Sequence, residues 1–196
     1  MYGLARHAKL YERGAALLAR PLYRRVATDV AAAELAPGAV VVDVGTGPGL
    51  VPLMIAEQCP ELSVTGVDLS AEMIARARGA AQSRQPGPGA SVTFEVADVA
   101  ALPWGDESVD LLVSSLSMHH WDDRLAGLDD IVRVLRPGAQ AWIYDVRSMV
   151  RRAASAGPRP DADLRVELPL SGSSRFNPIG RLVLTRHRSD PSSPRG

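Results

Sequence analysis

The sequence has a single cysteine and no net charge, and each of these features excludes some classes of function. Cys59 is the only cysteine, which excludes an intramolecular disulfide and a cysteine-rich zinc site. The 22 basic residues balance 22 acidic residues, so we expect neither nucleic acid nor a membrane surface as a partner. No apolar run approaches the roughly 18 residues that a membrane-spanning helix needs. These absences favour a soluble, cytoplasmic protein and leave its oligomeric state open.

Apolar residues are abundant and follow the pattern of an α/β domain. Five apolar segments are expected to form strands, and helical spacing falls between them. The expected strands are 40–44, 63–67, 91–96, 109–113 and 139–146, and the expected helices are 50–58, 70–83 and 125–135. This alternation indicates a mostly parallel sheet with helices on both faces. A short helix near 148–155 and strands near 164–168 and 181–187 would follow.

The same patterns divide the chain into three parts. Residues 1–36 read as a helical cap, residues 37–188 as the α/β domain, and residues 189–196 as a disordered tail rich in serine and proline. The chain is therefore expected to hold a single domain with one site.

A glycine-rich turn follows the first expected strand, and acidic residues end three of the strands. Glycines at positions 45, 47 and 49 allow a tight turn and a close approach of backbone to a ligand. Asp43, Asp68 and Asp98 lie at or just after the ends of the first, second and third strands. Open α/β sheets bind ligands outside these strand ends. The acids suit a ligand that carries an ammonium group, a ribose and an adenine.

Five segments resemble, in order and spacing, the successive motifs of class I S-adenosylmethionine (SAM)-dependent methyltransferases, of the type that act on small molecules. They are Val42-Asp-Val-Gly-Thr-Gly-Pro-Gly49, Gly66-Val-Asp-Leu-Ser70, Ala97-Asp-Val-Ala-Ala-Leu-Pro-Trp104, Val109-Asp-Leu-Leu-Val-Ser-Ser115 and Leu135-Arg-Pro-Gly138. The resemblance covers about residues 37 to 147. It implies a Rossmann-like domain with a seven-stranded sheet in the order 3-2-1-4-5-7-6, whose seventh strand is antiparallel, and SAM as the cofactor.

The resemblance also implies which residues hold the methionine part of SAM. The residues that would line it are Gly45, Thr46, Gly47 and Gly49. Asp43 would order this loop or hold the amino group through a water molecule. Ser114 would offer its carbonyl oxygen to the same amino group.

For the adenosine part, the resemblance implies a second set of residues. Asp68 would bind the ribose, and Leu69 would pack on the adenine face. Met73 would close the edge of that pocket. Asp98 would take the adenine amino group, and the backbone of Val99 would read the ring.

The reaction itself needs little from the protein, because SAM supplies an activated methyl group. Alignment of the acceptor with the sulfur–methyl bond is worth roughly 7–11 kcal/mol. A general base would help a weakly acidic acceptor, and His119 and His120 are the candidates because they follow the fourth strand. The alternative is that one histidine packs and the other faces solvent. Adjacent histidines without further ligands do not indicate a metal site.

Candidate substrate contacts come from the N-terminal cap and from the loops. His7 and Tyr11 share a helical face, Trp121 follows the two histidines, and Arg147 follows the fifth strand. Ordinary packing, or a surface ion pair for Arg147, is the alternative for each. The compact chain favours a small-molecule methyl acceptor.

Two other functions remain open at this point. A nicotinamide-dependent oxidoreductase shares the strand, the glycines and the distant acid, although its glycine spacing differs from Gly45-x-Gly47-x-Gly49. A SAM-binding subunit without catalysis is the other alternative.

Overall fold

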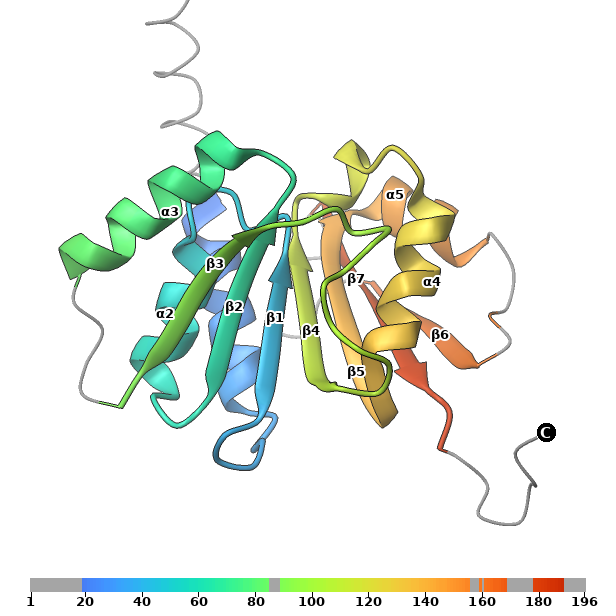
Figure 1. Ribbon diagram of the computed structural model, residues 1–196. Coiled ribbons are helices and arrows are strands. Elements are labelled where there is room, and N and C mark those ends of the chain that lie inside the picture. Colours follow the sequence, from blue (N-terminus) through green and yellow to red (C-terminus); the bar gives the residue numbers. More distant parts are fainter. Residues whose placement is uncertain (1–18, 85–88, 156–158, 160, 169–177, 189–196) are drawn as a thin grey trace, which may run out of the picture.

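A computed structural model describes residues 19–84, 89–155, 159, 161–168 and 178–188. These residues form one seven-stranded sheet between two layers of helices (Figure 1). The strands are β1 (Val40–Val44), β2 (Ser63–Asp68), β3 (Ser91–Val96), β4 (Val109–Ser115), β5 (Leu135–Val146), β6 (Ala162–Glu167) and β7 (Ile179–Arg186). Their order is β3-β2-β1-β4-β5-β7-β6. β7 is antiparallel to β5 and β6, and the other neighbours are parallel, which confirms the expected sheet.

Helices connect the parallel strands and cover both faces of the sheet. They are α2 (Leu50–Gln58), α3 (Ala71–Arg84), the 3-10 turn η1 (Met118–His120), α4 (Arg124–Val134) and α5 (Arg147–Ala154). A further helix over residues 19–31 precedes β1. Within the described ranges, no helix combines the length and the apolar character needed to cross a bilayer.

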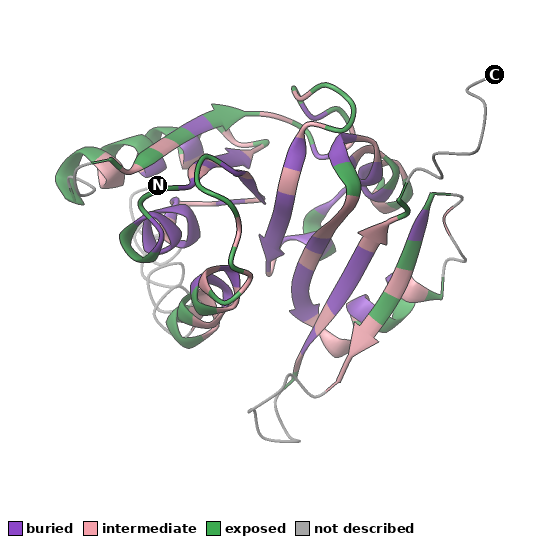
Figure 2. Ribbon diagram, turned by 90° about the horizontal axis from the view of Figure 1, so that it is seen from below, coloured by how far each residue is buried: buried purple, intermediate pink, exposed green. Residues whose placement is uncertain are grey.

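The core lies in two main clusters, one on each face, and neighbouring residues of β1 point to different clusters. Val41 packs with α2 and with Val30 of the first helix, whereas Val42 packs with Leu128 and Ile131 of α4. Every side chain of β1 after Val40 is therefore buried, and Figure 2 shows that buried residues (purple) concentrate in the middle of the sheet. Burial on both faces explains the continuous apolar run of this strand.

The start of β5 differs from the expectation. Leu135 was expected to close the preceding helix, and the strand to begin at 139 after Pro137-Gly138. Instead α4 ends at Val134, and β5 begins at Leu135, which pairs with Val109. Leu135 is fully buried with an extended backbone, and the register shifts between Val109 and Leu111. Pro137-Gly138 therefore lies within β5, at an irregularity of the strand, and does not separate the helix from the strand.

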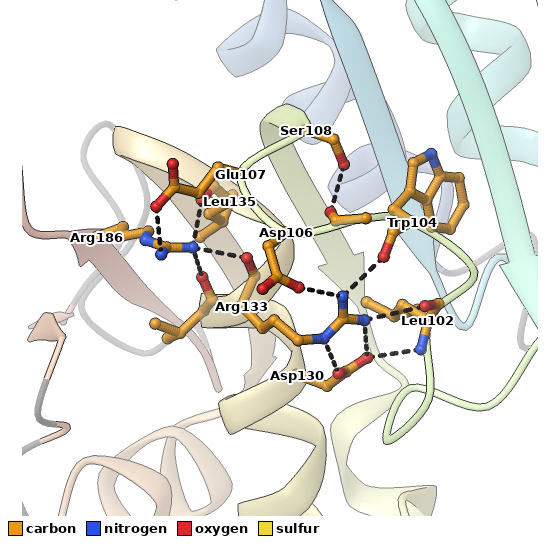
Figure 3. A network of polar contacts seen from close by, with 11 residues as sticks. Leu102, Trp104, Asp106, Glu107, Ser108, Asp130, Arg133, Leu135 and Arg186 are labelled. Carbon is orange, nitrogen blue, oxygen red and sulfur yellow. Dashed lines mark hydrogen bonds and ion pairs between the residues drawn. The ribbon is translucent and has the colours of Figure 1, made fainter. Parts of the chain in front are cut away.

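An arginine network holds the long connection between β3 and β4 in place (Figure 3). Arg133 of α4 donates to the carbonyl oxygens of Leu102 and Trp104 at 3.0 and 2.8 Å, and to the carboxylates of Asp106 and Asp130. Asp130 in turn accepts from the amide of Leu102 at 2.6 Å. This connection begins with residues 97–100, which border the cavity described next.

Candidate active site

A cavity of about 1390 Å³ lies over the carboxyl ends of the central strands. Its wall comes from the first helix, the turn after β1, the ends of β2 and β3, and the loop after β4. The predicted site residues in this wall are Gly45, Thr46, Gly47, Asp68, Leu69, Met73, Asp98, Val99, His119, His120 and Trp121. Residues between positions 45 and 121 therefore meet at one edge of the sheet, where open α/β sheets bind ligands.

Four predicted residues lie outside the cavity wall. Asp43, Gly49 and Ser114 are buried beneath it. Arg147 is half-buried at the start of α5, where its Nε and Nη2 atoms have no hydrogen-bond partner. The remaining two candidates, His7 and Tyr11, lie outside the described residues.

Two glycines of the turn, Gly47 and Gly49, have different structural roles. Gly47 has a φ of +53° and open space on the side where a side chain would stand. Gly49 has a φ of +78°, and a Cβ atom there would come within 2.7 Å of Ala77 on α3 and Phe94 on β3. Gly47 thus leaves room in the cavity, whereas Gly49 allows the start of α2 to approach its neighbours.

Asp68 is fixed by backbone amides at the end of β2. One carboxylate oxygen accepts from the amide of Gly47 at 2.9 Å, and the other accepts from the amide of Ser70 at 2.9 Å. Each oxygen has a second lone pair for a ligand hydroxyl. The carboxylate therefore holds the glycine turn and faces the cavity with both oxygens oriented.

Asp43 is a buried carboxylate under the glycine turn. Neither of its oxygens has a hydrogen-bond partner, nor does the buried hydroxyl of Thr46 beside it. Burial raises the pKa of Asp43 to about 7, with the Asp68 carboxylate adding to the shift and the nearby Thr46 hydroxyl opposing it. Buried polar groups are normally paired, so this pair fits a site whose partner is a ligand group or an ordered water.

The loop after β4 closes the cavity beside the turn. Ser117 holds this loop against β1 and β4. Its Oγ lies 3.2 Å from the Ser114 hydroxyl, donates to the Val44 carbonyl oxygen at 3.3 Å and accepts from the indole N–H of Trp121 at 2.9 Å. Trp121 is buried and lines the cavity.

Two residues of the site are not among the site residues predicted from the sequence. Tyr23, on the first helix, lines the cavity, and burial together with the Asp43 carboxylate raises the pKa of its hydroxyl. Asp145, at the end of β5, is fully buried and pairs with the imidazole of His119. The sequence does place this acid within the apolar run 139–146, which is unusual for a buried strand. It does not reveal the partner, because His119 lies 26 positions earlier.

The cavity can therefore hold a large polar ligand along the strand ends. Glycine amides, a fixed carboxylate and an unpaired buried acid lie toward β1 and β2, and two histidines lie beyond them at β4. Among the described residues, no group of three or more histidine, cysteine or acidic side chains could bind a metal ion.

Residues 41–138 match the family described as methyltransferase domain. The chain belongs to this family. The match contains the glycine turn, the strand-end acids and both histidines. It also agrees with the sheet order, since an antiparallel β7 between β5 and β6 departs from the 3-2-1-4-5-6 order of nicotinamide-binding sheets.

Curated relatives of this methyltransferase domain are about a third identical to it over the aligned part of the chain. It is 35% identical over 58% of its length to an arsenite methyltransferase of Halobacterium salinarum. It is 37% identical over 55% to a ubiquinone/menaquinone biosynthesis C-methyltransferase of Geobacter sulfurreducens, and 36% identical over 63% to a demethylmenaquinone methyltransferase of Thermus thermophilus. The alignments cover 29%, 42% and 53% of these relatives, so the chain spans about a third to a half of their length.

Solved structures agree on the fold. A structure described as a putative S-adenosyl-L-methionine-dependent methyltransferase of Methanococcus maripaludis matches with a TM-score of 0.72, at 17% identity and with 94% of both chains covered. A [4+2]-cyclase matches with a TM-score of 0.65, at 18% identity and with 84% of this chain and 81% of that one covered. Because the fold carries more than one reaction, the function has to be argued from the site.

Proposed function

We propose that this methyltransferase domain transfers a methyl group from SAM to a small-molecule acceptor. The observation that carries the proposal is the cavity itself, whose wall contains the glycine turn, Asp68 and Asp98 together with His119 and His120. The family match over residues 41–138 supports the reaction class. The relatives named for arsenite and for quinones support a small-molecule acceptor.

The residues present fit SAM. Open space beside Gly47 and the unpaired carboxylate of Asp43 suit the methionine end with its ammonium group. Asp68 presents two oriented oxygens to the ribose hydroxyls, and Leu69, 65% exposed, offers an apolar surface to adenine. Asp98 and Val99 would meet the adenine edge, with Met73 closing that end.

The bound cofactor would supply an electrophilic methyl group on its sulfonium sulfur. The chain would contribute orientation and the exclusion of water. Trp121 and the loop after β4 wall the cavity beside the glycine turn, so an acceptor held there would lie beside the methyl group. Alignment of this kind needs no covalent step on the protein.

The chemistry of the wall bears on the acceptor. Soft centres such as trivalent arsenic are typically held by thiolates. Cys59, the one cysteine of the sequence, is buried after α2 and does not line the cavity. We therefore favour an organic acceptor. A cytoplasmic location, suggested by the scarcity of cysteine, is part of the same proposal.

Calorimetry with SAM and S-adenosylhomocysteine tests the cofactor, with NADH as the matched negative ligand. Binding of both adenosyl ligands without binding of NADH is expected, and the reverse would restore the oxidoreductase alternative. Incubation with methyl-labelled SAM and small-molecule extracts then tests transfer. Tight SAM binding without any labelled product would favour the SAM-binding subunit without catalysis.

A further inference from the structure

Asp145 is a fully buried carboxylate whose contacts converge on His119. Its two oxygens lie 3.2 and 3.1 Å from Nδ1 of His119. One of them also accepts from the backbone amide of His119 at 3.3 Å, and the other accepts from the amide of Val146 at 2.7 Å. The carboxylate at the end of β5 therefore fixes both the backbone and the ring of a residue in the cavity wall.

This arrangement sets the tautomer of the neutral imidazole. The donors around Asp145 suit an ionised carboxylate, which can only accept hydrogen bonds. Nδ1 of His119 must then carry the proton, which leaves the lone pair on Nε2. The His119 side chain is 37% exposed and lines the cavity, and no described residue hydrogen-bonds its Nε2.

His120 lacks these features. Its ring lies 4.0 Å from that of His119, and both residues line the cavity. Within the described part of the chain, however, no carboxylate pairs with His120. Of the two histidines, only His119 has a buried partner that orients its ring and can stabilise its charged form.

The position of His119 along the cavity indicates what it would meet. The strand order places β4 and β5 on the side of β1 away from β2 and β3. His119, which contacts Asp145 at the end of β5, therefore lies on the other side of the glycine turn from Asp68 at the end of β2. With an adenosyl group held at β2 and β3, the imidazole would lie on the acceptor side.

We propose that His119, positioned by Asp145, is the general base for a weakly acidic hydroxyl, and that the acceptor is therefore a phenol. This inference rests on the proposed function. The hydroxyl O–H bond breaks and its proton passes to Nε2. The phenolate oxygen forms the bond to the methyl group, and the sulfur of SAM keeps the electron pair of its broken bond to carbon. The imidazolium is stabilised by Asp145 and later releases the proton to water.

The first test needs no acceptor. Long-range proton–nitrogen NMR spectra of the protein labelled with 15N-histidine report which ring nitrogen carries the proton. His119 is expected almost entirely as the Nδ1–H tautomer, and Asp145→Ala is expected to return it to a mixture. His187 is a matched internal control, because its Asp163 partner is exposed, and Asp163→Ala should leave the His119 signals unchanged. An Nε2–H tautomer of His119 in the unsubstituted protein would overturn the proposal.

The second test uses methyl-labelled SAM with two probes, a phenol that is neutral at the assay pH and a nitrophenol that is already ionised. His119→Gln should lower kcat with the neutral phenol by about 10²–10⁴-fold, with little change in the KM for SAM. The loss with the ionised nitrophenol should be much smaller. Asp145→Asn should lower kcat in the same pattern by a smaller factor. His120→Gln should affect both phenols alike, and His187→Gln, outside the cavity wall, should leave kcat unchanged.

The outcomes separate this inference from the proposed function. Absence of SAM binding would contradict the proposed function itself. SAM binding without methylation of either phenol would overturn the acceptor class alone. Equal losses for both phenols, or equal losses for His119→Gln and His120→Gln, would assign His119 a structural role.

Discussion

Ser117 occupies the space in which a side chain at position 45 would stand. A Cβ atom on Gly45 would overlap the Cβ and Oγ atoms of Ser117, and Gly45 itself has a φ of +70°. Ser117 in turn holds Trp121 and contacts the carbonyl oxygen of Val44. The first glycine of the turn therefore lets the β4 loop close against β1, which sets one wall of the cavity.

Gly45→Ala should destabilise the protein by about 2–4 kcal/mol, since a positive φ costs roughly 1–2 kcal/mol and overpacking a similar amount or more. Urea unfolding measures the loss. Gly79→Ala is the matched control, because Gly79 lies inside α3 with no atom within 4 Å of its missing Cβ. That change should be neutral or stabilise by up to about 1 kcal/mol. Equal stability of the two variants would contradict the role given to Ser117.

The sequence predicts the bounds of an element correctly where residues within that element set them. The bounds of β1, α2 and β3 match the expected ones, because apolar runs and the glycine turn mark them directly. The last two strands were expected within two residues of β6 and β7. The predicted start of β5 was wrong, because the strand begins where Leu135 pairs with Val109 of the neighbouring strand, and the sequence does not show this pairing.

Contacts between distant segments explain what the sequence could not supply. The pairing of Asp145 with His119 depends on the parallel alignment of β4 and β5. The packing role of Gly49 depends on how closely Ala77 and Phe94 approach it. Spacing alone predicts that a residue lies at the strand ends, but not whether its side chain faces the cavity or the layer below.

Arg133→Ala should destabilise the protein by about 2 kcal/mol, because the carbonyl oxygens of Leu102 and Trp104 would lose a charged donor. Arg133→Lys should recover only part of the loss, since an ammonium group cannot reproduce the planar fork of donors. Urea unfolding again provides the measurement. Arg165→Ala is the control, because the Arg165 side chain is 68% exposed and pairs with Glu167 at the surface, where such pairs are worth little. A loss for Arg133→Ala no larger than this control would show that the network is dispensable.

Asp68→Asn should weaken SAM binding by roughly 10- to 100-fold, as bonds to charged groups are worth about 1.5–3 kcal/mol. The asparagine side chain keeps one acceptor oxygen, but its NH2 group would face the backbone N–H of Gly47 or of Ser70. That backbone N–H would then lose its acceptor. Calorimetry with SAM measures the change. Asp163→Asn removes an exposed carboxylate outside the cavity wall and should leave the affinity as it is. Unchanged affinity for Asp68→Asn would remove Asp68 from the cofactor site.

Asp43→Asn should stabilise the ligand-free protein at about pH 8 and make no difference near pH 4. The pKa of Asp43 is about 7 in the folded protein against an ordinary value of 3.8. Between these values the folded state binds more protons than the unfolded state, so stability falls as the pH rises through 7. An asparagine avoids the cost of an ionised, unpaired carboxylate. Urea unfolding of both proteins at several pH values gives the two slopes.

The same carboxylate should link SAM binding to pH. A ligand ammonium group near Asp43 lowers the pKa of its carboxyl, so binding below about pH 7 releases a proton and affinity rises with pH up to that value. Asp43→Asn should bind SAM more weakly and lose this pH dependence. Calorimetry in buffers of different ionisation enthalpy counts the released proton directly. If the variant and the original protein release equal numbers of protons, the carboxylate under the glycine turn does not meet the ammonium group.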